Sequence, residues 1–224
     1  MSQDAAVPAE GRARRPWAVF VVATLLIAGA AFAAGRFSMF GAVGPGAPNA
    51  ADMGFARDMQ LHHAQAVEMA MIEYRDTDDD ELRAIAYDIA TAQSAQAGEM
   101  YGWLVHWGVP QASDQPLMAW MSGSDHDHGA PADGEQLTDE ELREAMGMAS
   151  PAELTALREA TGTEQDCLFT ELMIRHHTGA IEMVRAVQEL GSDPRVTQVA
   201  SGMAEAQQRE IEGLQAVHDR LACG

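Results

Sequence analysis

An internal duplication constrains the fold of this chain more than any other feature. When the 224-residue sequence is shifted by 114 positions, residues 55–63 fall on residues 169–177 without a gap, and both segments carry Phe, Met and His-His at the same places. The match keeps its register through residues 86–93, which fall on residues 200–207. A register held over a helix and the turn after it indicates that a two-helix unit has been duplicated. Each such unit needs a neighbour against which to bury its apolar face.

Each copy has the pattern of an antiparallel helical hairpin. Apolar residues recur every three or four positions on both sides of an acidic turn at 76–80, and the second copy has a glycine stop and a proline start at 191–194. Alternating runs of β-branched or aromatic residues, which are typical of strands, are nearly absent. The sequence therefore predicts an all-α fold, a four-helix bundle made of two duplicated antiparallel helical hairpins.

The duplication also divides the chain. We expect one domain over residues 51–223, with repeat one at 51–109, a connecting region at 110–162 and repeat two at 163–223. The connecting region contains two capping-box sequences, at Thr138 and Ser150, which predict two short helices.

The N-terminal segment resembles a membrane-targeting sequence. Three arginines, at positions 12, 14 and 15, precede an uncharged apolar run over residues 17–34, which is about long enough to cross a bilayer. We therefore expect a cytoplasmic tail at 1–16, a transmembrane anchor at 17–36, a Gly/Pro-rich linker at 37–50 and an extracytoplasmic C-terminal domain. Residues 31–33 also resemble a signal cleavage site, and cleavage would make the domain periplasmic or secreted.

Charge excludes one class of partner. The chain has 14 basic residues, all arginine, against 34 acidic ones, and four of the arginines precede residue 37. The folded part is therefore strongly anionic and would repel nucleic acid. The two cysteines are too few for a four-thiolate metal site.

The duplicated segment Met-x-x-His-His-x-x-Ala-x-Glu-Met carries the chemistry. Its methionine and first histidine lie one helical turn apart, so a thioether and an imidazole can reach one metal ion. Thioether sulfur is soft and neutral and favours Cu(I) over Zn²⁺ or Fe²⁺, while imidazole accepts both oxidation states of copper. If the two motif helices cross antiparallel, Met183 comes opposite His62 and Met69 comes opposite His176, which predicts two equivalent copper sites. The predicted ligands are Met59, His62, His63, Met69, Met173, His176, His177 and Met183.

Each of these residues also has a structural interpretation. Methionine at helical spacing commonly fills a core, and adjacent histidines on a helix are often one buried and one solvated. Their joint occurrence in register in both copies favours metal binding. We expect Glu68 and Glu182 either to face solvent or to orient an imidazole. A weaker candidate site, for secondary copper loading, is formed by Met118, Met121, His126 and His128.

These motifs resemble the family of domain of unknown function 305. The resemblance covers about residues 50–223 and rests on Phe-x-x-x-Met-x-x-His-His-x-x-Ala-x-x-Met, on Trp103–Gly108 and on Asp166–His177. It implies a ferritin-like bundle outside the cytoplasm that binds copper through the eight motif positions. The second copy departs from the first where Val184–Arg185 replaces Ala70–Met71 and where Val217 replaces a tryptophan, which argues against equal affinity of the two copies.

Two other functional classes remain open. A di-iron or other redox enzyme on the same bundle requires Glu-x-x-His on two helices, but Met59 and Met173 stand where those glutamates belong. An envelope protein that only docks partners would bind no metal. We expect a membrane-anchored, extracytoplasmic copper-binding protein that sequesters or transfers Cu(I) in copper homeostasis or tolerance and catalyses no reaction.

A disulfide is expected between Cys167 and Cys223. Cys167 is near the start of one helix of the second hairpin, and Cys223 is near the end of the other. Antiparallel helices bring these ends together, and an extracytoplasmic location favours oxidation. The alternative is a pair of reduced thiols, one of which could bind Cu(I).

Overall fold

The computed structural model describes residues 46–125 and 137–223 of the chain. The predicted tail and anchor over residues 1–36, most of the predicted linker, and His126 and His128 of the secondary site lie outside these ranges. Within the described ranges, no helix combines the length and the apolar character that a membrane crossing requires.

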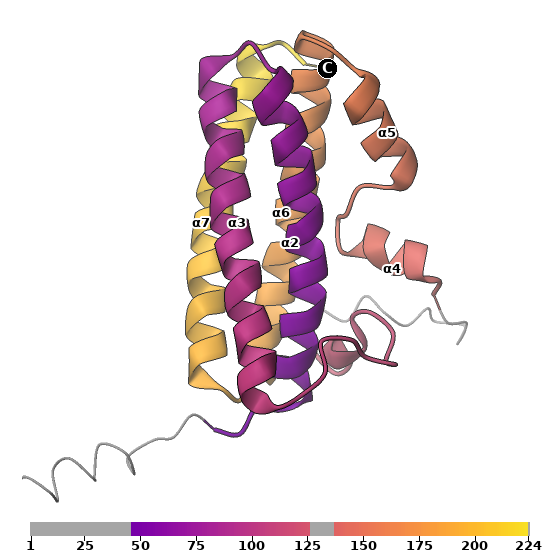
Figure 1. The fold of residues 1–224 in the computed structure, drawn as a ribbon, viewed down its shortest axis with the longest axis vertical. Helices are drawn as coiled ribbons and strands as arrows, with labels where there is room; N and C mark the ends of the chain where they lie inside the picture. The colour runs from indigo at the N-terminus through magenta and orange to yellow at the C-terminus, as the bar shows by residue number, and fades with distance from the viewer. Residues whose placement is uncertain (1–45, 126–136, 224) are drawn as a thin grey trace, which may run out of the picture. The chain divides into compact units, whose positions relative to one another are not determined.

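All regular secondary structure in the described part of the chain is helical, as predicted, and these ranges contain no strand. Four long helices stand side by side as a bundle (Figure 1): α2 (Ala50–Asp76), α3 (Asp80–Trp107), α6 (Thr163–Leu190) and α7 (Pro194–Arg220). The connecting region contributes a short 3₁₀ helix, η1 (Ala119–Met121), and two short helices, α4 (Asp139–Ala145) and α5 (Pro151–Glu159). Both predicted capping boxes are confirmed, because Thr138 and Ser150 each exchange hydrogen bonds with a glutamate three residues later.

The duplication is visible in the way the helices begin. Asp79 and Asp193, which are equivalent in the repeat, cap α3 and α7. The Asp79 carboxylate accepts a hydrogen bond of 3.1 Å from the Glu81 N–H, and the Asp193 carboxylate accepts one of 2.9 Å from the Arg195 N–H. Each hairpin therefore turns with the same chemistry, because a side-chain oxygen satisfies a backbone donor that the first helical turn leaves free.

The second hairpin turn is also tied to the first hairpin. Asp52 accepts hydrogen bonds from the N–H groups of Ser192 and Asp193, at 3.0 and 3.1 Å. A Cβ on Gly191 would lie 2.7 Å from the Asp52 carboxylate and 2.6 Å from the Val187 carbonyl oxygen, so only glycine fits at this turn.

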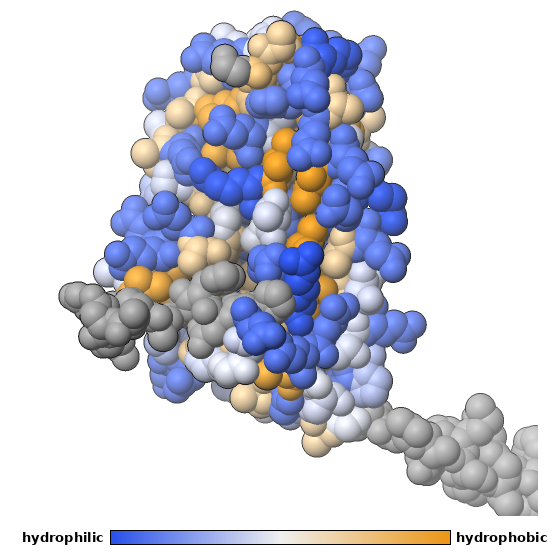
Figure 2. Space-filling view, turned by 180° about the vertical axis from the view of Figure 1, so that it is seen from behind, coloured by the Kyte–Doolittle hydropathy of each residue, from blue (hydrophilic) through white to orange (hydrophobic). Residues whose placement is uncertain are grey.

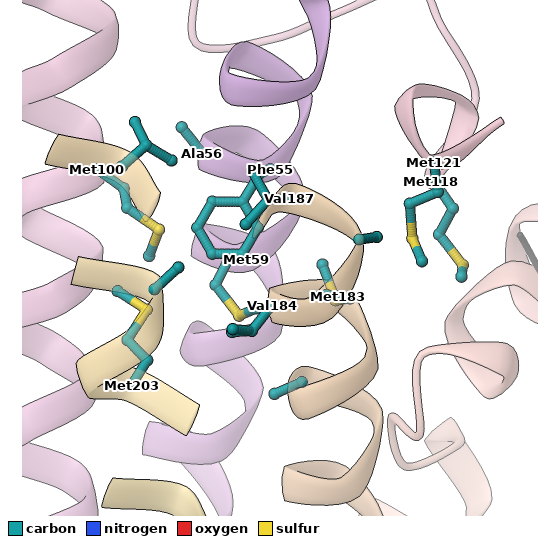
Figure 3. Close-up of a cluster of buried hydrophobic side chains, with 14 of the residues drawn as sticks. Phe55, Ala56, Met59, Met100, Met118, Met121, Met183, Val184, Val187 and Met203 are labelled. Atoms are coloured by element: carbon teal, nitrogen blue, oxygen red, sulfur yellow. The ribbon is translucent and has the colours of Figure 1, made fainter. Parts of the chain in front are cut away.

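The bundle core separates into two hydrophobic clusters, one toward each end. The first, which we call the methionine end, includes Phe55, Trp103 and eight buried methionines: Met59, Met100, Met118, Met121, Met146, Met148, Met183 and Met203. The second, which we call the aliphatic end, has only two buried methionines, Met69 and Met173, among residues such as Ile89, Leu157, Phe169, Leu172 and Leu214. Figure 3 shows Met59, Met100, Met183 and Met203 in the methionine end, with Met118 and Met121 of the connecting region apart from them.

The two hairpins pack against each other chiefly through α2 and α6, and α3 meets α7 on the other side. This arrangement places both copies of the duplicated Met-x-x-His-His motif at the same interface, because α2 and α6 each carry one copy. The face shown in Figure 2 is largely hydrophilic, with a narrow hydrophobic stripe, as the acidic composition leads one to expect.

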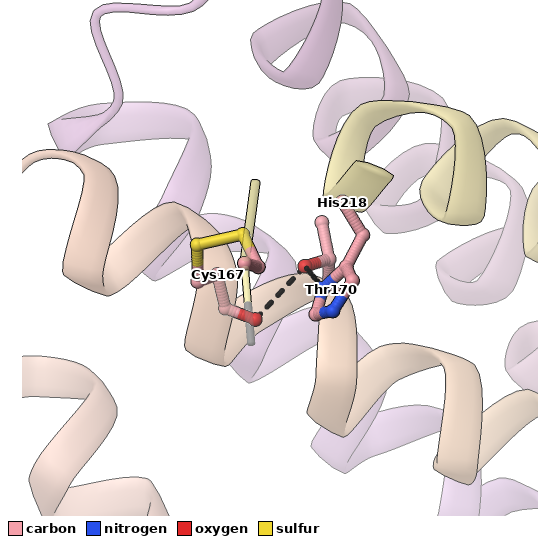
Figure 4. Close-up of a disulfide and its surroundings, with 4 residues drawn as sticks. Cys167, Thr170 and His218 are labelled. Atoms are coloured by element: carbon pink, nitrogen blue, oxygen red, sulfur yellow. Dashed lines mark hydrogen bonds between the residues drawn. A yellow bond between two sulfur atoms is a disulfide. The ribbon is translucent and has the colours of Figure 1, made fainter. Parts of the chain in front are cut away.

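A disulfide closes the second hairpin at the aliphatic end. Cys167 on α6 is bonded to Cys223, just beyond α7, with 5.4 Å between their Cα atoms (Figure 4). Beside it, the Thr170 hydroxyl donates to the Cys167 carbonyl at 2.8 Å and accepts from Nδ1 of His218 at 2.9 Å. The end of α7 is thereby fastened to the start of α6.

Candidate metal centre

Four buried histidines meet where α2 and α6 pack together. His62 and His63 come from α2, His176 and His177 come from α6, and none of the four is exposed. The rings of His62 and His176 are in contact, with 3.6 Å between their centroids and an angle of 35° between their planes. The His62 ring lies 6.4 Å from that of His63, and the His176 ring lies 6.2 Å from that of His177. The structure therefore brings the histidines of both copies into one cluster between the two ends of the core.

Oxygen atoms hold three of these imidazoles by the same ring nitrogen. Nε2 of His62 lies 3.0 Å from the Met146 carbonyl oxygen, Nε2 of His63 lies 2.8 Å from Oε1 of Gln96, and Nε2 of His177 lies 2.6 Å from the Glu210 carboxylate. An oxygen without a hydrogen can only accept, so Nε2 carries the proton in each neutral ring. The lone pair of each ring is then on Nδ1.

Those lone pairs have no partner. Nδ1 of His62, His63 and His177 is buried without a hydrogen bond, and both ring nitrogens of His176 are in the same condition. Buried polar atoms are normally paired, because burial without a partner costs free energy. Neutral imidazoles that donate one nitrogen to an oxygen and present the other are the form in which histidine binds metals.

Burial also keeps the rings of His62, His63 and His176 neutral. It lowers the pKa of His62 to about 3 and that of His63 to about 4, with the neighbouring histidines adding to the effect on His62. The pKa of His176 falls well below its usual value for the same reason. At neutral pH these nitrogen lone pairs are therefore not taken up by protons.

The two copies differ in the group behind the second histidine. Gln96 follows His63 by 33 residues and Glu210 follows His177 by the same 33 residues, so the contact is duplicated. An amide in the first copy becomes a carboxylate in the second. Only the second copy thus places a carboxyl group against its imidazole, and a carboxyl group behind an imidazole favours a cation bound to that ring.

The connecting region covers the centre with a short strap, residues 146–149, that supplies the oxygen bound by His62. The Gln65 side chain holds the strap by two hydrogen bonds, donating to the Ala149 carbonyl at 2.8 Å and accepting from the Ala149 N–H at 2.7 Å. The strap packs directly on α6 at Gly179. A Cβ at this position would collide with the Met146 carbonyl oxygen, so the close approach requires glycine. Gly147 has φ +76°, a conformation that favours glycine.

The four motif methionines are buried and divided between the two ends of the core. Met59 and Met183 belong to the methionine end, and Met69 and Met173 belong to the aliphatic end. Each end thus has one motif methionine from α2 and one from α6, the pairing expected from an antiparallel crossing. Within residues 46–125 and 137–223, no three His, Cys, Asp or Glu side chains are grouped so that they could hold a metal ion.

The weaker sequence candidates have other surroundings. Met118 and Met121 are packed in the core rather than displayed in a loop, and the Met118 N–H donates to the buried Asp58 carboxylate at 2.8 Å. Glu68 forms an ion pair with Arg158, and Glu182 forms one with Arg185. The structure places Glu210 on the motif histidine His177, a contact that the sequence analysis does not predict.

Comparisons with known proteins agree with this architecture. The family model of domain of unknown function 305 (DUF305) matches residues 52–218. A solved DUF305 protein from Streptomyces coelicolor, described as a candidate secreted protein, is 36% identical, with 77% of this chain and 94% of that chain covered and a TM-score of 0.66. A DUF305 fragment from Deinococcus radiodurans is 26% identical, covering 78% and 99% of the two chains with a TM-score of 0.63.

A third solved structure extends the comparison of folds. CopM in its Cu(II)-bound form is 22% identical, with 75% of this chain and 96% of that chain covered and a TM-score of 0.55. The same protein is also described in Cu(I)-bound and Ag-bound forms. Among curated proteins, none matches this sequence.

Proposed function

From the premise that this chain belongs to the DUF305 family, we propose that it binds copper at the buried histidine and methionine centre between α2 and α6. The observation that carries the proposal is the set of unpartnered ring nitrogens on His62, His63, His176 and His177. Hydrogen bonds to oxygen fix three of these rings with Nδ1 as the free ligand atom. A bound metal ion would satisfy these buried lone pairs, which have no hydrogen-bond partner within the protein.

The donor set favours Cu(I). The methionines that flank the centre are buried and uncharged, and thioethers bind Cu(I) far better than they bind Zn²⁺, Fe²⁺ or Mg²⁺. The core also makes a monovalent ion less costly than a divalent one, because the desolvation penalty rises steeply with charge. The copper-bound and silver-bound forms of CopM, a neighbour in fold, are consistent with soft-metal binding on this bundle.

We place the domain outside the cytoplasm, held to the membrane by residues 17–36 or released from it by cleavage. The arginines and the apolar run near the N-terminus support this location, as do the secreted character suggested for the S. coelicolor relative and the Cys167–Cys223 disulfide. The domain sequesters Cu(I) or transfers it to another protein and has no catalytic turnover. The absence of Glu-x-x-His before His62 and His176 argues against a di-iron enzyme.

A competition titration tests the proposal. The full chain in detergent is titrated with Cu(I) against a chromogenic Cu(I) chelator, in parallel with His62→Ala/His176→Ala and with His106→Ala as a surface control. We expect the wild type and the control to withdraw Cu(I) from the chelator. The double variant should bind at least tenfold more weakly, because both of the imidazoles that meet at the centre of the cluster are lost. Equal binding by the double variant would contradict the ligand assignment.

A further inference from the structure

The duplication provides an internal comparison of what each core position requires. Met59 in the methionine end corresponds to Met173 in the aliphatic end, and Met183 corresponds to Met69. Two further methionines break this match. Met100 corresponds to Leu214 and Met203 corresponds to Ile89, and all four of these side chains are buried.

Packing alone does not account for these two methionines. Leu214 and Ile89 fill the equivalent positions with no exposed surface at all, so the helix geometry accepts branched aliphatic side chains there. Leucine and methionine have similar volumes and exchange at low cost in cores. The property that methionine adds at these positions is its polarizable sulfur.

Helix register brings the two methionines into the part of the core that contains Met59. Met59 lies one turn before His63 on α2, and Met100 lies one turn beyond Gln96 on the antiparallel α3, so both continue the facing sides marked by the His63–Gln96 contact. Met203 lies two turns before Glu210 on α7, on the side that Glu210 turns toward α6. Figure 3 shows the three side chains entering the same part of the core from three helices.

We propose that Met59, Met100 and Met203 form a thioether site for one soft monovalent cation, Cu(I) or Ag(I), in the methionine end. This inference rests on the proposed copper-binding function and adds two ligands, Met100 and Met203, that lie outside the duplicated motif. Three neutral sulfurs in an apolar core favour a soft ion of low charge and disfavour hard divalent ions. The aliphatic end, with Leu214 and Ile89, lacks such a site.

Methyl NMR of the full chain in detergent tests the proposal directly. The methionine methyl groups are labelled with ¹³C, their signals are assigned by single Met→Leu substitutions, and Ag(I) is added stepwise. We expect the Met100 and Met203 signals to shift together as one Ag(I) equivalent binds. The signal of Met71, which is 37% exposed, serves as the reference and should stay in place.

A matched variant separates this site from the imidazole centre. Met100→Leu/Met203→Ile copies the residues of the aliphatic end, so it should keep the fold, lose one Ag(I) equivalent and still bind Cu(I) at the histidines. If the wild type withdraws Cu(I) from the chelator but its Met100 and Met203 signals do not move, the thioether site is wrong and the proposed function stands. If the wild type binds neither ion, both are wrong.

Discussion

The two ends of the bundle core contain the same repeat positions and fill them with different residues. Where the methionine end has Met100 and Met203, the aliphatic end has Leu214 and Ile89. All four of these side chains are buried. The two copies therefore keep the burial of these positions while the chemical type of the side chain differs. Positions of equal burial but unequal residue type are therefore the ones to examine for function in a duplicated fold.

The two ends also differ in what fastens them. At the aliphatic end, the disulfide joins Cys167 on α6 to Cys223, just beyond the end of α7, and Glu73 is buried near Asp166. At the methionine end, the equivalent of Glu73 is Val187, no disulfide is present among the described residues, and Asp52 holds the α6–α7 turn by hydrogen bonds. The disulfide is therefore at the end of the core that has fewer buried methionines.

Removing the disulfide should have the largest effect on this comparison. The bond closes a loop with a sequence separation of 56, so Cys167→Ser/Cys223→Ser should lower the free energy of unfolding by about 4 kcal/mol in the chain-entropy model. Urea unfolding followed by circular dichroism measures the loss. Because the change is confined to the aliphatic end, the folded variant should still show the Ag(I)-dependent shifts of Met100 and Met203. A variant as stable as the wild type would show that the bond does not fasten this end.

A smaller, pH-dependent effect should also be confined to the aliphatic end. Burial, with nearby Asp166 adding to it, raises the pKa of Glu73 from 4.5 to about 9. Between these values the folded chain holds a proton that the unfolded chain releases, so the free energy of unfolding should fall as the pH rises toward 9.

Glutamine cannot ionise, so Glu73→Gln should reduce this pH-dependent loss of stability. From pH 6 to pH 9 the melting temperature of the wild type should decrease by roughly 5 °C more than that of the variant. Glu99→Gln, at an exposed position of α3, is the control and should leave the pH dependence unchanged. Identical pH profiles for Glu73→Gln and the wild type would refute this account of Glu73.

Much of the fold follows from the sequence because the signals are local. The repeat, the helical periodicity and the capping boxes at Thr138 and Ser150 depend on neighbouring residues, and the structure confirms the helices they predict. The eight motif positions come from the same local pattern, and all of them are buried near the α2–α6 interface.

The remaining parts of the centre depend on contacts between distant residues. The Met146 carbonyl reaches His62 across 84 positions of the chain, and a backbone oxygen leaves no mark in the sequence. Gln96 and Glu210 do leave a mark, because each follows its histidine by the same interval in the duplicated segment. Comparing polar residues between the two copies would have identified both.

Copper binding by the histidine and methionine side chains is tested most directly by X-ray absorption at the copper edge, measured on the full chain after it has been loaded with Cu(I) and desalted. We expect copper to stay bound and its coordination sphere to contain both thioether sulfur and imidazole nitrogen, because the unpartnered ring nitrogens lie between two ends that each contain buried methionines. Copper that is lost on desalting, or that is bound by nitrogen and oxygen atoms alone, would contradict the proposed copper centre.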